Sequence, residues 1–353
     1  MPRRRKRVDP ALFQLPVEQL REGLYSDTQL RWTRDVLRAS ERPPCVTLQF
    51  SSKQPGYVCG IDEAVAVLRT CVDDWSAVAV HALFDGDRVE SWDTVLTVEG
   101  PYHLFAHLET PILGALARRT MICTQSRSLV EAARHKSVFL LSARDDLWSA
   151  QPGDGHAART GGVCELATEA QTQLGGQAKV AAVPHALVAA CGGDTVAATH
   201  AFAAHVPPEV PLLALADYAN DCVAASVALV RAFDGRIWGV RLDTSATLVD
   251  RSVIPQMGAF APTGVNAQLV WNVRNALDAE GFGEVRIVAS GGITPEKIRA
   301  FEEDGVPVDA YGIGSVLYSG RFDFTADVVQ VEGKPQARAG RVLRPNAKLE
   351  RVK

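Results

Sequence analysis

Two glycine-rich turns late in the chain have the composition of a phosphate-binding site. Ser290, Gly291 and Gly292 follow one apolar run, and Gly312 and Gly314 close the next. Glycines let backbone N–H groups approach a phosphate closely, and a helix that starts directly after such a turn adds favourable charge. The alternative is that these glycines only make tight turns. Their repetition on two successive runs favours phosphate binding.

Charged residues follow other apolar runs of the same region. Arg241 and Asp243 are two positions apart, so in a strand their side chains share a face, and Asp217 follows the preceding run. Arg144 and His185 also come directly after apolar runs. An inward arginine and carboxylate can hold a phosphate and a sugar hydroxyl or metal, whereas the alternative is a salt bridge at the rim.

The elements that must position these residues form a repeated strand and helix rhythm. The predicted strands are continuous apolar runs at residues 137–143, 179–183, 212–216, 237–242, 286–289 and 310–313. The predicted helices lie between them at 165–174, 194–205, 222–233, 265–279 and 295–301. Continuous apolar strands alternating with helices are typical of a parallel sheet that is buried on both faces. We therefore predict an α/β fold with an irregular (β/α) barrel, whose site lies at the carboxyl ends of the strands.

The rest of the chain has a different pattern. Short strands at 46–50, 57–59, 77–84 and 95–98 alternate with a helix at 61–72, helical segments at 102–116 and 124–134 follow, and short strands return near the end. We predict a basic disordered tail at 1–8, an N-terminal α+β sandwich domain at 9–115, a barrel domain at 116–322, and C-terminal strands at 323–353 that return to the sandwich.

Composition narrows the class of protein. The 353 residues are 47% hydrophobic and 22% charged with a net charge of -4, which is typical of a globular protein and gives no electrostatic reason to bind nucleic acid. No apolar run approaches the roughly 20 residues of a membrane helix. Seven scattered cysteines have no zinc-ligand spacing and are expected to be reduced thiols. A cytoplasmic location is expected.

Eight short motifs, taken together, resemble the nicotinate phosphoribosyltransferase family in its shorter archaeal and bacterial form. The motifs occupy residues 21–27, 84–87, 108–114, 183–187, 215–221, 239–244, 288–293 and 311–315, in family order. The resemblance implies a type II phosphoribosyltransferase that joins nicotinate to phosphoribosyl diphosphate in NAD salvage, with Mg²⁺ as the metal and possible coupling to ATP hydrolysis. It also implies a homodimer or higher homo-oligomer.

The resemblance also implies a role for each matching residue. Ser290, Gly291, Gly292, Gly312 and Gly314 would bind the 5-phosphate. Asp217 and Asp243 would orient ribose hydroxyls and, indirectly, the magnesium-bound diphosphate. Arg144 and Arg241 would bind anionic oxygens and the nicotinate carboxylate, and Tyr25 would stack on the ring in a neighbouring subunit's site. His185 matches a histidine that ATP can phosphorylate; on the residues alone, a single histidine after an apolar strand is more often structural.

Departures from the family pattern keep other interpretations open. Ala181-Ala182 removes a hydroxyl beside His185, which leaves ATP coupling open, and Asp145-Asp146 replaces cations in a loop expected to meet an anion, which leaves the ring substrate open. The alternatives are a quinolinate phosphoribosyltransferase, whose Thr-Arg-Lys-Thr motif is missing here, and a catalytically weakened homologue that binds a nucleotide as a sensor or partner subunit. A Schiff-base aldolase barrel fits worst, because none of these strand ends presents a lysine.

Overall fold

The computed structural model describes residues 5–141, 143–175 and 181–353, and these residues form a mixed α/β structure with two main sheets. The strands are β1 Cys45–Ser52, β2 Gly56–Tyr57, β3 Ala79–Ala82, β4 Arg88–Val89, β5 Thr94–Pro101, β6 Ser137–Leu140, β7 Ala181–Ala182, β8 Leu212–Leu215, β9 Gly239–Leu242, β10 Arg286–Ala289, β11 Ala310–Ile313, β12 Phe324–Val331, β13 Lys334–Pro335 and β14 Glu350–Arg351. The helices are α1 Val17–Glu22, α2 Thr28–Arg38, α3 Ile61–Cys71, α4 Glu109–Ala132, α5 Gln151–Thr160, α6 Glu169–Thr172, α7 His185–Ala190, α8 Thr195–Ala203, α9 Cys222–Phe233, α10 Ala267–Ala279 and α11 Pro295–Glu303.

The first sheet is antiparallel and draws its strands from both ends of the chain. Its order is β13-β12-β1-β5-β3-β14, so β12 and β14 pair with strands more than 200 residues earlier in the sequence. Apolar side chains of β1 and β5 pack on α3, with Leu48, Phe50, Leu68 and Leu96 fully buried. Burial of each such side chain stabilises the fold by about 1.5 to 3 kcal/mol. This packing makes one of two large cores.

The second sheet is parallel, in the order β6-β11-β10-β9-β8-β7, and helices pack against it. All six predicted strands are present, β7 only from residue 181, because residues 176–180 lie outside the described part. Pairing of Phe139 with Glu165 adds a bridge beyond β6, but no strand pairing among the described residues closes this sheet into a barrel. Val240, Leu242, Ile287 and Ala289 are fully buried in the second large core.

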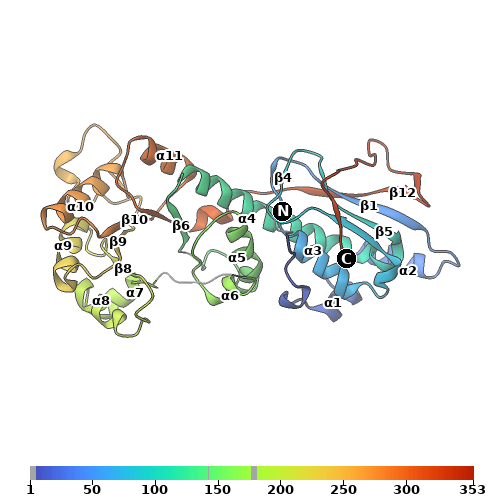
Figure 1. Ribbon diagram of the computed structural model, residues 1–353, viewed down its shortest axis with the longest axis horizontal. Coiled ribbons are helices and arrows are strands. Elements are labelled where there is room, and N and C mark those ends of the chain that lie inside the picture. Colours follow the sequence, from blue (N-terminus) through green and yellow to red (C-terminus); the bar gives the residue numbers. More distant parts are fainter. Residues whose placement is uncertain (1–4, 142, 176–180) are drawn as a thin grey trace.

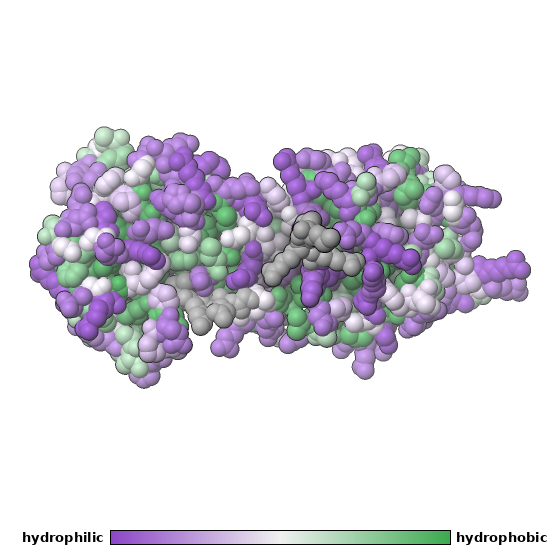
Figure 2. Space-filling model, in the orientation of Figure 1, coloured by the Kyte–Doolittle hydropathy of each residue, from purple (hydrophilic) through white to green (hydrophobic). Residues whose placement is uncertain are grey.

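The two sheets lie in two lobes, at the left and right of Figure 1, and helix α4 joins these lobes. At 1.5 Å per residue its 24 residues span about 36 Å. Ile112 and Leu116 belong to the first core, whereas Ile122 and Leu129 belong to the second. The predicted boundary at residue 115 therefore falls inside a continuous helix. In Figure 2 hydrophilic side chains cover most of the visible face, with apolar residues scattered between them.

Three local expectations were wrong. The two helical segments predicted at 102–116 and 124–134 are two short 3-10 turns followed by one helix, α4. The helix predicted at 165–174 is reduced to α6, because Glu165 pairs with Phe139 of β6 and residues 166 and 167 line a cavity. The basic tail is not free at residues 7 and 8, because Arg7 pairs with Asp62 (2.9 Å) and the Val8 N–H donates to the same carboxylate. Residues 1–4 lie outside the described part.

Candidate functional site

The glycine turns open into a cavity at the carboxyl ends of the parallel strands. This first cavity has a volume of about 560 Å³, and its lining includes Arg144, Arg241, Asp243, Ser290, Gly291, Gly292, Gly312 and Gly314. Gly291 and Gly292 have φ values of +71° and +65°, which residues with a side chain rarely adopt. A side chain at Gly312 would lie 2.4 Å from Leu141 Cδ1, so that position requires glycine for close packing. The parallel topology brings these distant segments to one edge.

A hydrogen-bonded cluster of Arg241, Asp243 and Ser290 lies on the floor of the first cavity. Arg241 Nη1 donates to Asp243 Oδ2 at 3.0 Å and lies 3.4 Å from Ser290 Oγ, and the Ser290 hydroxyl lies 2.8 Å from Asp243 Oδ1. Arg241 Nε is buried and has no hydrogen-bond partner among the described residues. The hydrogen bonds of the cluster fix the Arg241 guanidinium but leave an N–H donor of this group unused. A guanidinium with an unused donor suits an anionic ligand.

A second cavity of about 410 Å³ adjoins the first. The two share Leu141, Arg144, Arg241 and Asp243 in their linings. Its other walls combine apolar groups with one histidine, at Leu140, Ala143, Leu166, Ala167, Ala182, Val183, Pro184, His185 and Ala186. Apolar walls with a few convergent polar groups are typical of small-molecule binding sites.

His185 and Asp217 form a polar pair at the edge of the second cavity. His185 is the first residue of α7, and its Nε2 lies 3.1 Å from Asp217 Oδ2. Burial raises the pKa of the Asp217 carboxyl above its usual range, and the hydrogen bond to His185 partly offsets this. Asp217 Oδ1 is buried without a partner among the described residues. An orphaned carboxylate oxygen near Asp243 fits a cation with hard oxygen ligands, as Mg²⁺ requires.

The loop after β6 carries Asp145 and Asp146, the two carboxylates at positions where the family resemblance implies cations. Arg144 lines both cavities, and Asp145 lines the first. Asp146 instead accepts a hydrogen bond from Arg118 Nη2 at 2.5 Å, which lowers the pKa of its carboxyl. Arg118 also pairs with Asp154 (2.7 Å) on α5. Arg118 does not follow a strand, so it was not among the predicted site residues; the adjacent pair Arg118-Arg119 in a long helix is its only signal in the sequence.

Tyr25 lines neither of these cavities. It lies in the lobe of the antiparallel sheet, directly after α1, and its side chain is 50% exposed. Leu24, Trp32 and Val36, on the same segment and on α2, are exposed as well. The role of Tyr25 in a neighbouring subunit stays a prediction.

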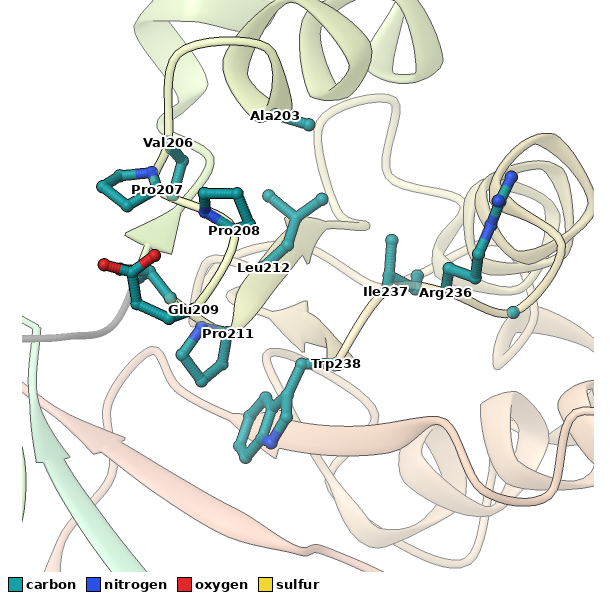
Figure 3. Close-up of a pocket in the computed structure, with 12 residues that line it drawn as sticks. Ala203, Val206, Pro207, Pro208, Glu209, Pro211, Leu212, Arg236, Ile237 and Trp238 are labelled. Atoms are coloured by element: carbon teal, nitrogen blue, oxygen red, sulfur yellow. The ribbon is translucent and has the colours of Figure 1, made fainter.

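Another cavity lies at the opposite, amino-terminal ends of β8 and β9 (Figure 3). Its volume is about 420 Å³, and Pro207, Pro208, Pro211 and Trp238 supply much of its wall. None of the candidate site residues lines it. Because sites in parallel α/β folds lie at the carboxyl ends of the strands, the glycine-lined cavities are the better candidate.

The chain is similar in sequence to pyridine phosphoribosyltransferases. Residues 33–120 match the family model of the quinolinate phosphoribosyl transferase N-terminal domain. The nicotinate phosphoribosyltransferase pncB1 of Mycobacterium tuberculosis is 26% identical over 278 residues, which cover 76% of this chain and 57% of that protein. The chain thus spans little more than half the length of this curated relative.

Solved structures of such enzymes share the fold. The nicotinate-nucleotide pyrophosphorylase from Pyrococcus furiosus matches with a TM-score of 0.80 and 27% identity over 96% of this chain and 85% of that chain. Human nicotinic acid phosphoribosyltransferase matches with a TM-score of 0.69 and 17% identity over 90% of this chain and 77% of that chain. The predicted resemblance to nicotinate phosphoribosyltransferases is confirmed. Among the described residues no helix is both long and apolar enough to span a membrane.

Proposed function

We propose that this relative of the nicotinate phosphoribosyltransferases transfers phosphoribosyl from phosphoribosyl diphosphate to nicotinate, giving nicotinate mononucleotide and diphosphate. The observation that carries the proposal is the pair of adjoining cavities that share Arg144, Arg241 and Asp243. One is lined by glycine turns and the other by apolar walls. A sugar phosphate and a flat anionic ring need such adjoining sites, because the ring nitrogen has to meet the ribosyl carbon.

Each side chain has a binding or electrostatic role in this mechanism. Backbone N–H groups of the glycine turns hold the 5-phosphate, and Arg241 neutralises anionic oxygens of the same substrate. Asp217 and Asp243 orient the ribose hydroxyls. Arg144, which lines both cavities, binds the nicotinate carboxylate. The reaction needs no covalent nucleophile, since positioning and stabilisation of the positively charged ribosyl centre supply most of the rate.

Mg²⁺ is the metal that this reaction implies, and the residues present fit it. Asp217 and Asp243 would orient the diphosphate-bound ion, and the unpartnered Asp217 Oδ1 supports this assignment. When bound, the ion neutralises the diphosphate as it leaves.

ATP coupling through His185 belongs to the same proposal. A neutral imidazole can accept a phosphoryl group, and the carboxylate of Asp217 at 3.1 Å would orient the ring. Ala182, next to this site, offers no hydroxyl to bind a nucleotide phosphate. We therefore expect product formation with or without ATP, and a smaller gain from ATP than in relatives with a threonine nearby.

Quinolinate is the second candidate ring substrate, favoured by the match of residues 33–120 to the quinolinate family model. It carries two carboxylates where nicotinate carries one. The described arginines that line the second cavity are Arg144 and Arg241, and Arg241 pairs with Asp243 and is assigned to the anionic oxygens of phosphoribosyl diphosphate. Among the described residues this leaves the Arg144 guanidinium for the ring, which matches the single carboxylate of nicotinate.

Incubation of the purified protein with phosphoribosyl diphosphate, Mg²⁺ and either ring compound tests the proposal. We expect nicotinate mononucleotide from nicotinate by mass spectrometry, and little or no carbon dioxide from quinolinate. If product formed only from quinolinate, quinolinate and not nicotinate would be the substrate. Absence of turnover together with tight binding of phosphoribosyl diphosphate would indicate a sensor or partner subunit. The pairing of Asp146 with Arg118 argues against that alternative, because it neutralises one of the two carboxylates that motivated it.

We also infer that the parallel sheet is part of an irregular, incompletely closed barrel. Residues 166 and 167 lie beyond β6, residues 182 and 183 belong to the other edge of the sheet, and all four line the second cavity. Both edges of the sheet therefore curve toward one space. The domain limits at 9–115, 116–322 and 323–353 remain part of this proposal.

A homodimer is the smallest assembly in which Tyr25 can act in a neighbouring site. The exposed side chains of Leu24 (65%), Trp32 (61%) and Val36 (70%) support a subunit contact there. Mixing Tyr25→Ala subunits with Asp243→Asn subunits should restore partial activity if sites are shared. A monomeric mass in light scattering would contradict the assembly.

A further inference from the structure

A buried thiol, a carboxylate and an imidazole meet at a place that the proposed reaction does not use. One ligand atom from each of Cys59, Asp85 and His156 lies within 4.8 Å of the other two. Cys59 precedes α3, Asp85 follows β3 and His156 belongs to α5, so three separate segments converge. None of the three residues lines either of the two cavities at the ends of the parallel strands.

The three residues are held in place by a surrounding set of hydrogen bonds. The Cys59 N–H lies 3.0 Å from Thr120 Oγ1 of α4, and the Thr120 hydroxyl donates back to the Cys59 carbonyl at 3.0 Å. The Ile61 N–H donates to Asp85 Oδ1 at 2.8 Å, so Asp85 Oδ2 faces His156 Nε2 at 3.0 Å. Metal ligands are oriented in the same way by outer hydrogen bonds.

The backbone around the cluster is equally constrained. The loops that carry Cys59 and Asp85 are joined by hydrogen bonds from Gly86 N to Val58 O (2.7 Å) and from Val58 N to Asp87 O (2.9 Å). Gly60 has φ +87°, and a side chain there would lie 2.7 Å from the Ala115 carbonyl, so this loop packs tightly on α4. The three groups therefore need little rearrangement to converge on one ion.

We propose that Cys59, Asp85 and His156 bind a Zn²⁺ ion that links the two lobes. Zinc prefers sulfur, nitrogen and carboxylate ligands in tetrahedral geometry, with ligand atoms about 3.3 to 3.6 Å apart at its usual bond lengths. The distance of 3.0 Å between His156 Nε2 and Asp85 Oδ2 has to lengthen slightly, and Cys59 Sγ has to move closer to both atoms. Binding releases the Cys59 thiol proton to solvent. The proton that His156 Nε2 shares with Asp85 passes to solvent or to Nδ1 of the same ring, and two bonds to the metal replace the hydrogen bond between these residues.

The chemistry of the site separates it from the proposed Mg²⁺ site. Mg²⁺ takes hard oxygen ligands, whereas a thiolate and an imidazole select softer ions. The side chains of Asp85 and His156 are 7% and 17% exposed, so the cluster is not fully enclosed. Three protein ligands leave a fourth position for water. The inference does not depend on the proposed reaction.

Metal content and thermal stability of the full-length protein test the inference. We expect about one equivalent of Zn²⁺ per chain after dialysis against metal-free buffer, measured by elemental mass spectrometry. Chelation should lower Tm, and added Zn²⁺ should restore it, because a ligand that binds only the folded state stabilises it. Co²⁺ in place of Zn²⁺ should give a thiolate charge-transfer band in the absorption spectrum.

Conservative variants assign the metal to this site. Cys59→Ser, Asp85→Asn and His156→Asn should each lose the bound equivalent, and Cys59→Ser should also lose the Co²⁺ band. Asp85→Asn keeps an acceptor for the Ile61 N–H, so it is expected to fold. Cys164→Ser and His135→Asn change exposed residues and should keep the metal. Metal-free wild-type protein with no Zn²⁺-dependent shift in Tm, or equal zinc in the folded variants and wild type, would overturn the inference.

Discussion

Arg241 uses one nitrogen of its guanidinium to hold Asp243 and has others left for an anion. Its side chain is 12% exposed, and Nη1 reaches both Asp243 and Ser290. We predict that Arg241→Lys weakens the binding of phosphoribosyl diphosphate tenfold or more, because an ammonium cannot bond Asp243 and a phosphate in the same fork geometry. A charge-assisted hydrogen bond contributes about 1.5 to 3 kcal/mol, and 1.4 kcal/mol is a factor of ten.

Calorimetric titration measures this change, and Arg236→Lys is the matched control. Arg236 precedes β9 at the opposite end of the sheet and lines the proline-rich cavity. It should bind the substrate as the unmodified protein does. Equal affinities for both variants would place the phosphoribosyl site elsewhere.

Glu109, at the start of α4, carries a pH-dependent effect on stability. Burial, with smaller contributions from Asp327 and Asp27, raises the pKa of its carboxyl to about 7. A carboxyl whose pKa is raised in the folded state stabilises the fold at low pH, and this contribution is lost as pH rises through the folded-state pKa. We predict that Glu109→Gln gains stability relative to the unmodified protein between about pH 4.5 and 7, and keeps that gain at pH 8. Urea unfolding at pH 5 and 8 measures it, and a constant difference would contradict it.

At the scale of the elements, the turn between β10 and α11 contains a glycine that both adopts a positive φ and lines the first cavity. Gly292 in this turn and Gly333 between β12 and β13 have φ values of +65° and +69°, and neither has an atom within 4 Å of an added Cβ. Alanine at either position should cost about 1 to 2 kcal/mol of backbone strain. Only Gly292→Ala should also weaken phosphate binding, because its methyl group enters the first cavity. Thermal unfolding and substrate titration of both variants test this, and equal affinities would exclude the turn from the site.

Most of the parallel sheet could be predicted from sequence because its strands are continuous apolar runs, and β10 and β11 have the predicted bounds. Helix α5 could not, because its sequence contains Pro152, Gly153 and Gly155. These glycines serve packing: a Cβ on Gly153 would lie 2.2 Å from the Arg119 guanidinium, and one on Gly155 would lie 2.0 Å from the Gln171 carbonyl. The contact that requires them is tertiary, so local propensity predicts a loop.

The same distinction applies to the candidate site. Most of the candidate site could be assembled from sequence, because residues that follow parallel strands meet at one edge of the sheet. This applies to the glycine turns and to Arg144, His185, Arg241 and Asp243. The partner of Asp146 could not be predicted. Arg118 lies 28 residues earlier on α4 and reaches the loop only because α4 packs against α5. Side chains that come from another element carry no signal in the spacing of the motif.

At the scale of the whole molecule, Arg118 and Arg119 of α4 join elements of both lobes. Arg119 pairs with Glu63 of α3 at 2.8 Å, and both arginines pair with Asp154 of α5. The side chain of Asp154 is 2% exposed, and that of Arg119 is 11% exposed. Ion pairs of this kind are costly to break, because the remaining charge stays buried without its partner. The network therefore couples α3, α4, α5 and the loop that carries Arg144.

Asp154 is the centre of this network, and its removal should affect the molecule as a whole. We predict that Asp154→Asn lowers the free energy of unfolding by about 3 kcal/mol or more, because two arginines lose their buried counter-charge. Asp146→Asn is the matched control: the Asp146 side chain is 31% exposed and its one ion pair with a described residue is to Arg118, so the loss should stay below about 1 kcal/mol. Urea unfolding of the three proteins measures both effects. If the two variants were equally stable, the charge of Asp154 would not hold this network together, and the coupling of the lobes would have to come from the apolar contacts of α4.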